Sequence, residues 1–111
     1  MQYGEALLHD KDPEQAREAA RVLREQLIRH PDDPGLYELY AKASALAGNE
    51  IQSAEALAES YFRSGSVKEA MAQLEMLRDR QDLDYYQRSR VTARLEEMRI
   101  IMSEFGDDEA G

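Results

Sequence analysis

The sequence predicts an all-α fold, built as a stack of antiparallel helical hairpins. Apolar side chains recur at three- and four-residue intervals in every segment, and no segment sustains the period of two that is typical of a strand. Prolines and glycines divide the chain into segments of ordinary helix length. Because the connections between these segments are short, neighbouring helices must run antiparallel. We expect about six helices in a solenoid.

The first two helices are expected over residues 2–9 and from Pro13 to a stop at Pro31. Asp12 is a suitable N-cap, because its carboxylate can accept a hydrogen bond from a free amide of the first turn. Pro13 has the backbone angle of a first helical residue. The apolar face of this second helix consists of Ala16, Ala20, Leu23 and Leu27.

The third and fourth helices are expected from Pro34 to Gly48 and from Glu50 to Gly65. Apolar residues spread widely around the third helix, which indicates that more than one of its faces is covered. They are Leu36, Tyr40, Ala43 and Ala47, flanked by Tyr37, Leu39 and Leu46. The fourth helix has a narrower stripe, made of Ile51, Ala54, Ala58 and Tyr61.

The last two helices are expected to begin near Ser66 and after Asp84, which is a second suitable N-cap. The stripe of the fifth helix consists of Val67, Ala70, Leu74 and Leu77. That of the sixth consists of Val91, Leu95, Met98, Met102 and Phe105. Residues 106–111 read GDDEAG, and we expect this acidic segment to be a flexible tail.

Composition excludes several classes of protein. With 42% hydrophobic and 33% charged residues among 111, the chain is suited to one folded domain, and no apolar run approaches the ~18 residues of a membrane span. A formal net charge of -9 repels nucleic acid and anionic lipid. The absence of cysteine excludes disulfides and thiolate sites. The opening MQYGEALLHD lacks the pattern of a signal peptide, so we expect either a cytosolic protein or a segment of a longer one.

Small residues recur at a fixed spacing that indicates an internal repeat. Gly48 and Gly65 each close a helix and precede a short polar turn. Small side chains also recur twelve positions apart, which allows the backbones of two paired helices to approach closely. The pairs are Gly4 with Ala16, Ala41 with Ser53, and Ala58 with Ala70.

This pattern resembles the tetratricopeptide repeat, a helix-turn-helix unit of about 34 residues. With Pro34 at the start of a unit, Tyr37 takes the aromatic position of the repeat and Ala41 its small position. The units would then cover about 1–31, 34–64 and 66–105, within one domain over residues 1–105. The turn that begins at Gly65 fits the repeat as well, and it pairs the helices one step later. We use the proline register and keep the second one open.

Four segments in order resemble the C-terminal tetratricopeptide domain of the M48-family periplasmic zinc metalloproteases of Gram-negative bacteria. They are YGEALL, HPDDPGLYELYAKASALAG, LAESYFRSGSVKEAMAQLE and YYQRSRVTARLEEMR, and together they extend from Tyr3 to about Phe105. The resemblance implies a periplasmic, non-catalytic protein-interaction domain of a protease that acts in outer-membrane protein assembly and quality control. The implied partners are its own protease domain and the assembly machinery or a client, with zinc only in that protease domain.

No catalytic constellation is present in the sequence. The HExxH motif, which supplies two zinc ligands and a general base from one helix face, is missing. His9 and His30 lie on separate elements, and the adjacent Glu96 and Glu97 point to different sides of a helix. We expect no enzymatic activity and no cofactor in this chain. Metal binding by the two histidines with nearby carboxylates stays a weaker alternative.

Two sets of residues are candidates for protein binding. In the proline register the outward positions of the third helix line a concave groove, namely Gly35, Glu38, Lys42 and Ala45. The last helix has a local basic character from Arg88, Arg90, Arg94 and Arg99. This basic face is either a docking patch or a solvated face paired with Glu97 and Glu104.

An alternative function is a stand-alone adaptor that self-associates. The apolar stripe of the last helix has no further repeat to cover its far end, and such a face is suited to a homodimer.

Overall fold

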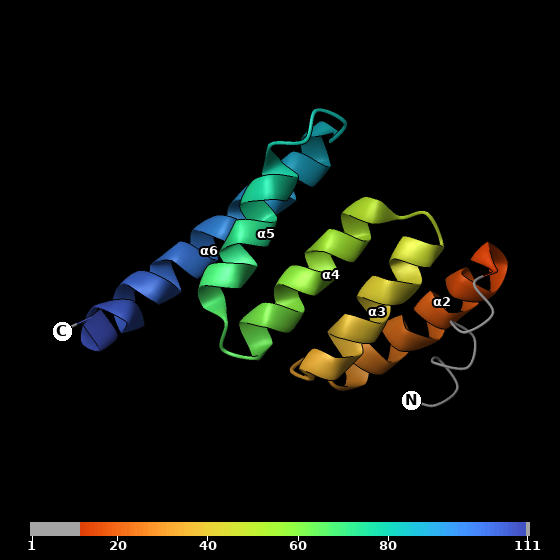
Figure 1. Cartoon of the computed structure of the whole chain (residues 1–111), viewed down its shortest axis with the longest axis horizontal. Helices are drawn as coiled ribbons and strands as arrows, with labels where there is room; N and C mark the ends of the chain where they lie inside the picture. Colours follow the sequence, from red (N-terminus) through yellow and green to blue (C-terminus); the bar gives the residue numbers. More distant parts are fainter. Residues whose placement is uncertain (1–11, 111) are drawn as a thin grey trace.

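A computed structural model of the chain describes the backbone of residues 12–110 and the side chains of residues 12–104. Over this range the structure is helical and contains no strand, which confirms the all-α prediction (Figure 1). The expected helix over residues 2–9, with Gly4, lies outside the described range. The helices are α2 (Pro13–Arg29), α3 (Pro34–Leu46), α4 (Glu50–Arg63), α5 (Val67–Arg78) and α6 (Tyr85–Ala110).

Each helix packs against the next one in the chain, from α2 through to α6 (Figure 1). Short connections reverse the direction at every step, so neighbours are antiparallel, as expected. One apolar cluster joins α4, α5 and α6 around Leu74, Leu95 and Met98. A second joins α2 and α3 around Leu23 and Leu36.

The helix ends follow the local signals in the sequence. The side chain of Asp12 accepts a hydrogen bond from the Glu14 amide at 2.9 Å, which confirms the predicted cap. Asp84 accepts from the Gln87 amide at 2.7 Å, and the Gln87 side chain accepts from the Asp84 amide at 3.0 Å. This reciprocal arrangement is a capping box. Asp33, which the sequence analysis did not single out, caps α3.

The two turns predicted to repeat have the same geometry. Gly48 and Gly65 have φ angles of 87° and 89°, a left-handed conformation that favours glycine. The residue after each glycine donates to a carbonyl five positions earlier, Asn49 to Ser44 and Ser66 to Tyr61, both at 2.8 Å. Both turns therefore end their helices by the same hydrogen-bonding pattern.

The predicted small-residue pairs lie where paired helices meet. Ala58 and Ala70 are both fully buried in one apolar cluster. The Ser53 hydroxyl donates to the Ala41 carbonyl at 2.7 Å, which joins α4 to α3. The backbones of α3 and α4 are therefore close enough for a serine to reach across.

Two details of the helices differ from expectation. Ala19, not Ala20, is the fully buried residue in the middle of α2, because both positions fall within the inward arc of the helix and Ala19 lies nearer its centre. The helix α6 continues to Ala110, through the acidic segment expected to be a tail. No proline follows Phe105 to stop it.

Two serines, Ser44 fully buried and Ser53 half-buried, provide a matched test of this packing. The Ser44 hydroxyl is buried without a hydrogen-bond partner among the described residues, whereas the Ser53 hydroxyl is bonded to Ala41. We expect Ser44→Ala to raise the free energy of unfolding by about 1 kcal/mol and Ser53→Ala to lower it by a similar amount. Both substitutions replace serine by alanine within a helix, so their helix-propensity effects are equal. The difference between the two variants in urea denaturation therefore reports the contribution of the hydroxyl groups. Equal effects of the two would contradict the interpretation.

Candidate functional site

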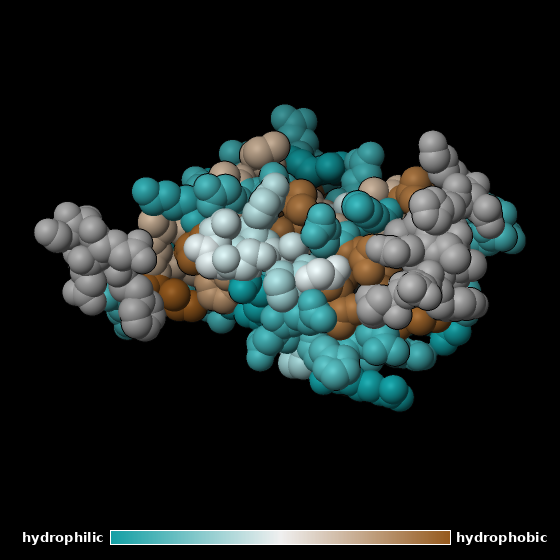
Figure 2. Space-filling model, turned by 60° about the horizontal axis from the view of Figure 1, so that its bottom comes forward, coloured by the Kyte–Doolittle hydropathy of each residue, from teal (hydrophilic) through white to brown (hydrophobic). Residues whose placement is uncertain are grey.

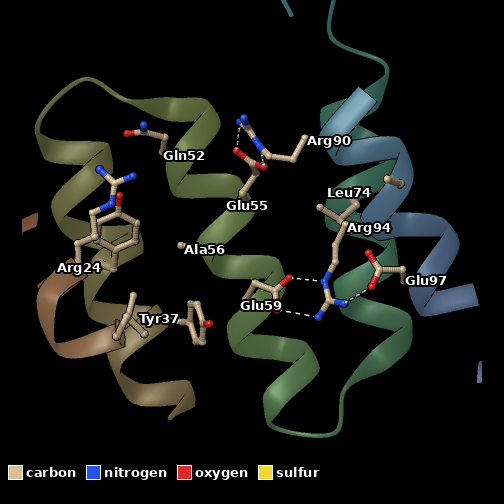
Figure 3. Close-up of a pocket in the computed structure, with 13 residues that line it drawn as sticks. Arg24, Tyr37, Gln52, Glu55, Ala56, Glu59, Leu74, Arg90, Arg94 and Glu97 are labelled. Atoms are coloured by element: carbon tan, nitrogen blue, oxygen red, sulfur yellow. Dashed lines mark hydrogen bonds and ion pairs between the residues drawn. The ribbon is translucent and has the colours of Figure 1, made fainter. Parts of the chain in front are cut away.

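An open groove of about 560 Å³ lies across the stack (Figure 3). Its lining comes mainly from α4 and α6, with two residues each from α2 and α3 and one leucine from α5. Ala56 and Leu74 are buried at its floor, and Leu27, Tyr37 and Tyr40 are half-buried around them. The groove therefore has an apolar floor below a rim of charged side chains.

The α6 side of the groove is closed by ion pairs. Arg90 donates two hydrogen bonds to Glu55, at 2.7 and 2.8 Å, and Arg94 donates two to Glu59, at 2.6 and 3.0 Å (Figure 3). Both pairs join α4 to α6, and in each pair the arginine and the glutamate are 35 residues apart in the sequence. Since α4 and α6 are separated in the chain by α5, these pairs fix how α6 lies relative to α4.

Arg94 is the more strongly held of the two arginines. It also lies 4.7 Å from the centre of the Phe62 ring and 3.4 Å from the Glu97 carboxylate. The hydrogen bonds that Arg94 donates to Glu59 raise the pKa of Arg94 above its ordinary value, and those that Arg90 donates to Glu55 do the same for Arg90. Both side chains are therefore held as cations, already paired within the chain.

Arg63 extends this network toward α3. Its guanidinium lies 3.6 Å from the Glu59 carboxylate and 5.6 Å from the centre of the Tyr37 ring. It also donates to the Pro31 carbonyl at 3.2 Å. The network thus connects the loop before α3 to α4 and α6.

The α2 side of the groove is different, because its polar side chains have no partners among the described residues. Arg24 and Gln52 line this side and form no hydrogen bond or ion pair there (Figure 3). The hydroxyls of Tyr37 and Tyr40 are likewise without a partner in that part of the chain. This open side offers donors and acceptors that another molecule could use.

The predicted basic residues of the last helix have mostly structural contacts. Arg90 and Arg94 do line the groove, with their main partners on α4. Within α6, Arg94 pairs with Glu97 as expected, and Arg99 pairs with Glu96. Arg88 donates to the carbonyl of Arg78 and, at 2.8 Å, to that of Arg80. It therefore holds the end of α5 rather than facing solvent.

The predicted groove residues of α3 lie elsewhere. Gly35, Glu38, Lys42 and Ala45 are exposed, but none lines the groove. Binding through this face stays a prediction. Sequence reasoning missed Arg24, Gln52, Glu55 and Glu59; the signal for the last two is their 35-residue spacing from an arginine, close to one repeat length.

No metal centre is found in the residues whose side chains are described. No group of three or more histidine, aspartate or glutamate side chains is placed there to hold an ion. His30 lies exposed at the C-terminal end of α2, while His9 is outside the described range. No helix within that range has the length and apolar character needed to span a membrane.

A double-mutant cycle tests the central ion pair. The Arg94 and Glu59 side chains are 24% and 19% exposed, whereas those of Arg99 and Glu96 are 45% and 61% exposed. From Arg94→Gln and Glu59→Gln we expect a coupling energy of about 1–2 kcal/mol in thermal or urea unfolding, because the bonds are bidentate and half-buried. The Arg99–Glu96 pair should give less than about 0.5 kcal/mol. Equal couplings would contradict a structural role for Arg94.

Comparison with known proteins found several similar proteins. No protein-family model matches the chain. It is 30% identical over 91 residues to the beta-barrel assembly-enhancing proteases of Escherichia coli strain K12, Shigella flexneri and Escherichia coli O157:H7. The match covers 82% of this chain but 19% of each relative. The chain is thus related to about a fifth of the length of these proteases.

Proposed function

We propose that this chain is a non-catalytic protein-protein interaction domain of the tetratricopeptide type, and that it binds partners in the groove. The observation that carries this proposal is the groove itself, with an apolar floor and unpartnered polar side chains on its α2 side. Consecutive antiparallel packing, the matching turns at Gly48 and Gly65 and the buried pair Ala58 and Ala70 support the repeat.

The lining of the groove favours one of the two registers. In a tetratricopeptide stack the first helix of each unit lines the concave face. Here α4 and α6 supply most of the lining and α5 supplies one residue, which favours α4 with α5, and hence α2 with α3, as the units. This is the pairing one step after the proline register, so the units 1–31, 34–64 and 66–105 shift by one helix.

We further propose that the domain is part of a periplasmic zinc metalloprotease that acts in outer-membrane protein assembly and quality control. Its similarity to beta-barrel assembly-enhancing proteases supports this. The partners would then be its own protease domain and the assembly machinery or a client. Zinc would belong to the HExxH motif of the protease domain, and not to this chain.

Sequencing the DNA upstream of the codon for Met1 tests the assignment to a protease. We expect an open reading frame that continues into a domain with HExxH and, further upstream, a signal peptide. A stop codon in frame directly before Met1 would contradict it and leave the chain as a separate adaptor.

Site-specific photocrosslinking in cells tests the groove. A photoreactive residue in place of Ala93, which lines the groove on α6, should give a crosslinked protein adduct that mass spectrometry identifies. The same residue in place of Ala45 tests the outer face of α3, and Ala72, exposed on α5 and outside the groove, is the control. Adducts from Ala45 alone would move the site to α3, and equal adducts from all three would contradict a specific site.

Self-association through α6 is the second candidate, and one observation favours it. The C-terminal part of α6 extends beyond α5 (Figure 1), with hydrophobic surface beside it (Figure 2). Ile100 is 52% exposed there. Light scattering should then show a dimer that Ile100→Lys dissociates, whereas a monomer at all concentrations would exclude it. Met98 is fully buried and unsuitable for this test.

A further inference from the structure

We propose that the groove takes an extended segment of a partner that presents one carboxylate to Arg24. This inference rests on the proposed function of the groove and names the chemistry of the ligand. It follows from the difference between the two sides of the groove, one closed by ion pairs and the other open.

Three arginines and three glutamates line the groove, and all three carboxylates are paired with Arg90 or Arg94. Arg90 and Arg94 each donate two hydrogen bonds to a carboxylate of the chain, Glu55 and Glu59, so a ligand carboxylate would compete with these partners. Arg24 has no carboxylate partner among the described residues. A guanidinium can bind a carboxylate through two parallel hydrogen bonds, which are stronger than hydrogen bonds between neutral groups. The unpaired guanidinium of Arg24 is therefore suited to bind one acidic side chain of a ligand.

The other unpartnered groups favour an extended backbone over a helix. The side-chain amide of Gln52 carries both a donor and an acceptor, and it is unpaired within the described part of the chain. Such an amide can bond both groups of a peptide unit, but a helix has already used these groups internally. An extended segment keeps them free.

The floor adds a second requirement, for an apolar side chain. Leu27, Tyr37 and Tyr40 are half-buried beside the fully covered Leu74. Burying an apolar side chain here removes apolar surface of both partners from water. The ligand is thus a segment with one apolar anchor and one carboxylate.

The net charge of the protein sets a limit on that carboxylate. A formal charge of -9 repels a strongly acidic segment, and it attracts a basic one without any specific contact. This attraction is long-range and is screened beyond about 8 Å at physiological salt, whereas the contact with Arg24 is local. We therefore expect the specific ligand to carry one carboxylate rather than a run of acidic residues. Its binding through Arg24 should persist at a salt concentration that screens the attraction between the acidic protein and a basic segment.

Amide chemical-shift titration of the ¹⁵N-labelled chain at physiological salt tests the inference. The probes are three blocked serine-glycine peptides, each with one phenylalanine and with glutamate, glutamine or lysine at the same position. We expect the glutamate peptide to shift the signals of groove residues and to bind about tenfold more tightly than the other two. Arg24→Gln should remove this difference. Arg29→Gln, an exposed arginine of the same helix outside the groove, should leave it unchanged.

Each other result overturns the inference. If the three peptides shift the groove signals with equal affinity, the carboxylate plays no part, although a binding groove stands. If the lysine peptide binds best and loses affinity with added salt, the net charge of the protein, and not the contact with Arg24, determines which peptide binds. If none shifts the groove, the proposed ligand is wrong, and photocrosslinking from Ala93 then decides separately whether the groove binds protein at all.

Discussion

Replacing Leu95 by alanine is expected to lower the free energy of unfolding by about 2–5 kcal/mol. Leu95 is 1% exposed and lies on α6 in the cluster that joins α4, α5 and α6. Truncation removes buried carbon atoms and leaves a cavity that rigid helices fill only in part. The free energy of unfolding of a small domain is about 5–15 kcal/mol in total, so this one substitution removes a large share of the stability.

Urea denaturation followed by circular dichroism at the helix band measures this loss. The control is Leu46→Ala, because Leu46 is 36% exposed at the end of α3 and should cost less than about 1 kcal/mol. If the two variants unfold at the same urea concentration, α6 does not contribute to a common core. If Leu95→Ala keeps the circular dichroism signal of the helices but loses the coupling energy between Arg94 and Glu59, then α6 detaches from the other helices without unfolding them.

Several of the features that the sequence predicted correctly depend only on neighbouring residues. The N-cap of Asp12 needs only the amide of Glu14, two residues away, and the capping box of Asp84 needs only Gln87. The turn of Gly65 likewise needs only a residue able to take a positive φ. Such signals lie within one helical turn, so their recognition requires no knowledge of how the helices pack.

The candidate site could be predicted less well, because its contacts join residues far apart in the chain. Arg94 meets Glu59 across 35 residues, whereas periodicity within α6 offered only partners on the same helix, Glu97 and Glu104. Which helices line the groove depends on the curvature of the stack, and the turn pattern allowed two registers. The proline register assigned α3 to the lining of the groove and so predicted that Glu38 lies in it, whereas the structure places Glu38 on an exposed surface outside the groove.

The spacing of small residues was the long-range signal that the sequence did carry, and Ala70 is the position that tests it most directly. Ala70 and Ala58 are both 0% exposed where α5 packs on α4. We expect Ala70→Leu to lower the free energy of unfolding by about 1–3 kcal/mol, because the added carbon atoms must push the two helices apart. Urea denaturation measures the change.

A displacement of α5 has a second consequence that separates packing from a general loss of stability. Since α6 packs on α5 but forms ion pairs with α4, moving α5 outward stretches the bonds from Arg94 to Glu59. The coupling energy of that pair should therefore fall in the Ala70→Leu background. Ala72→Leu adds the same atoms at an exposed position of α5 and should change stability by less than about 0.5 kcal/mol, with the coupling intact. Full coupling in both backgrounds would mean that α5 does not set the distance between α4 and α6, and hence the width of the groove.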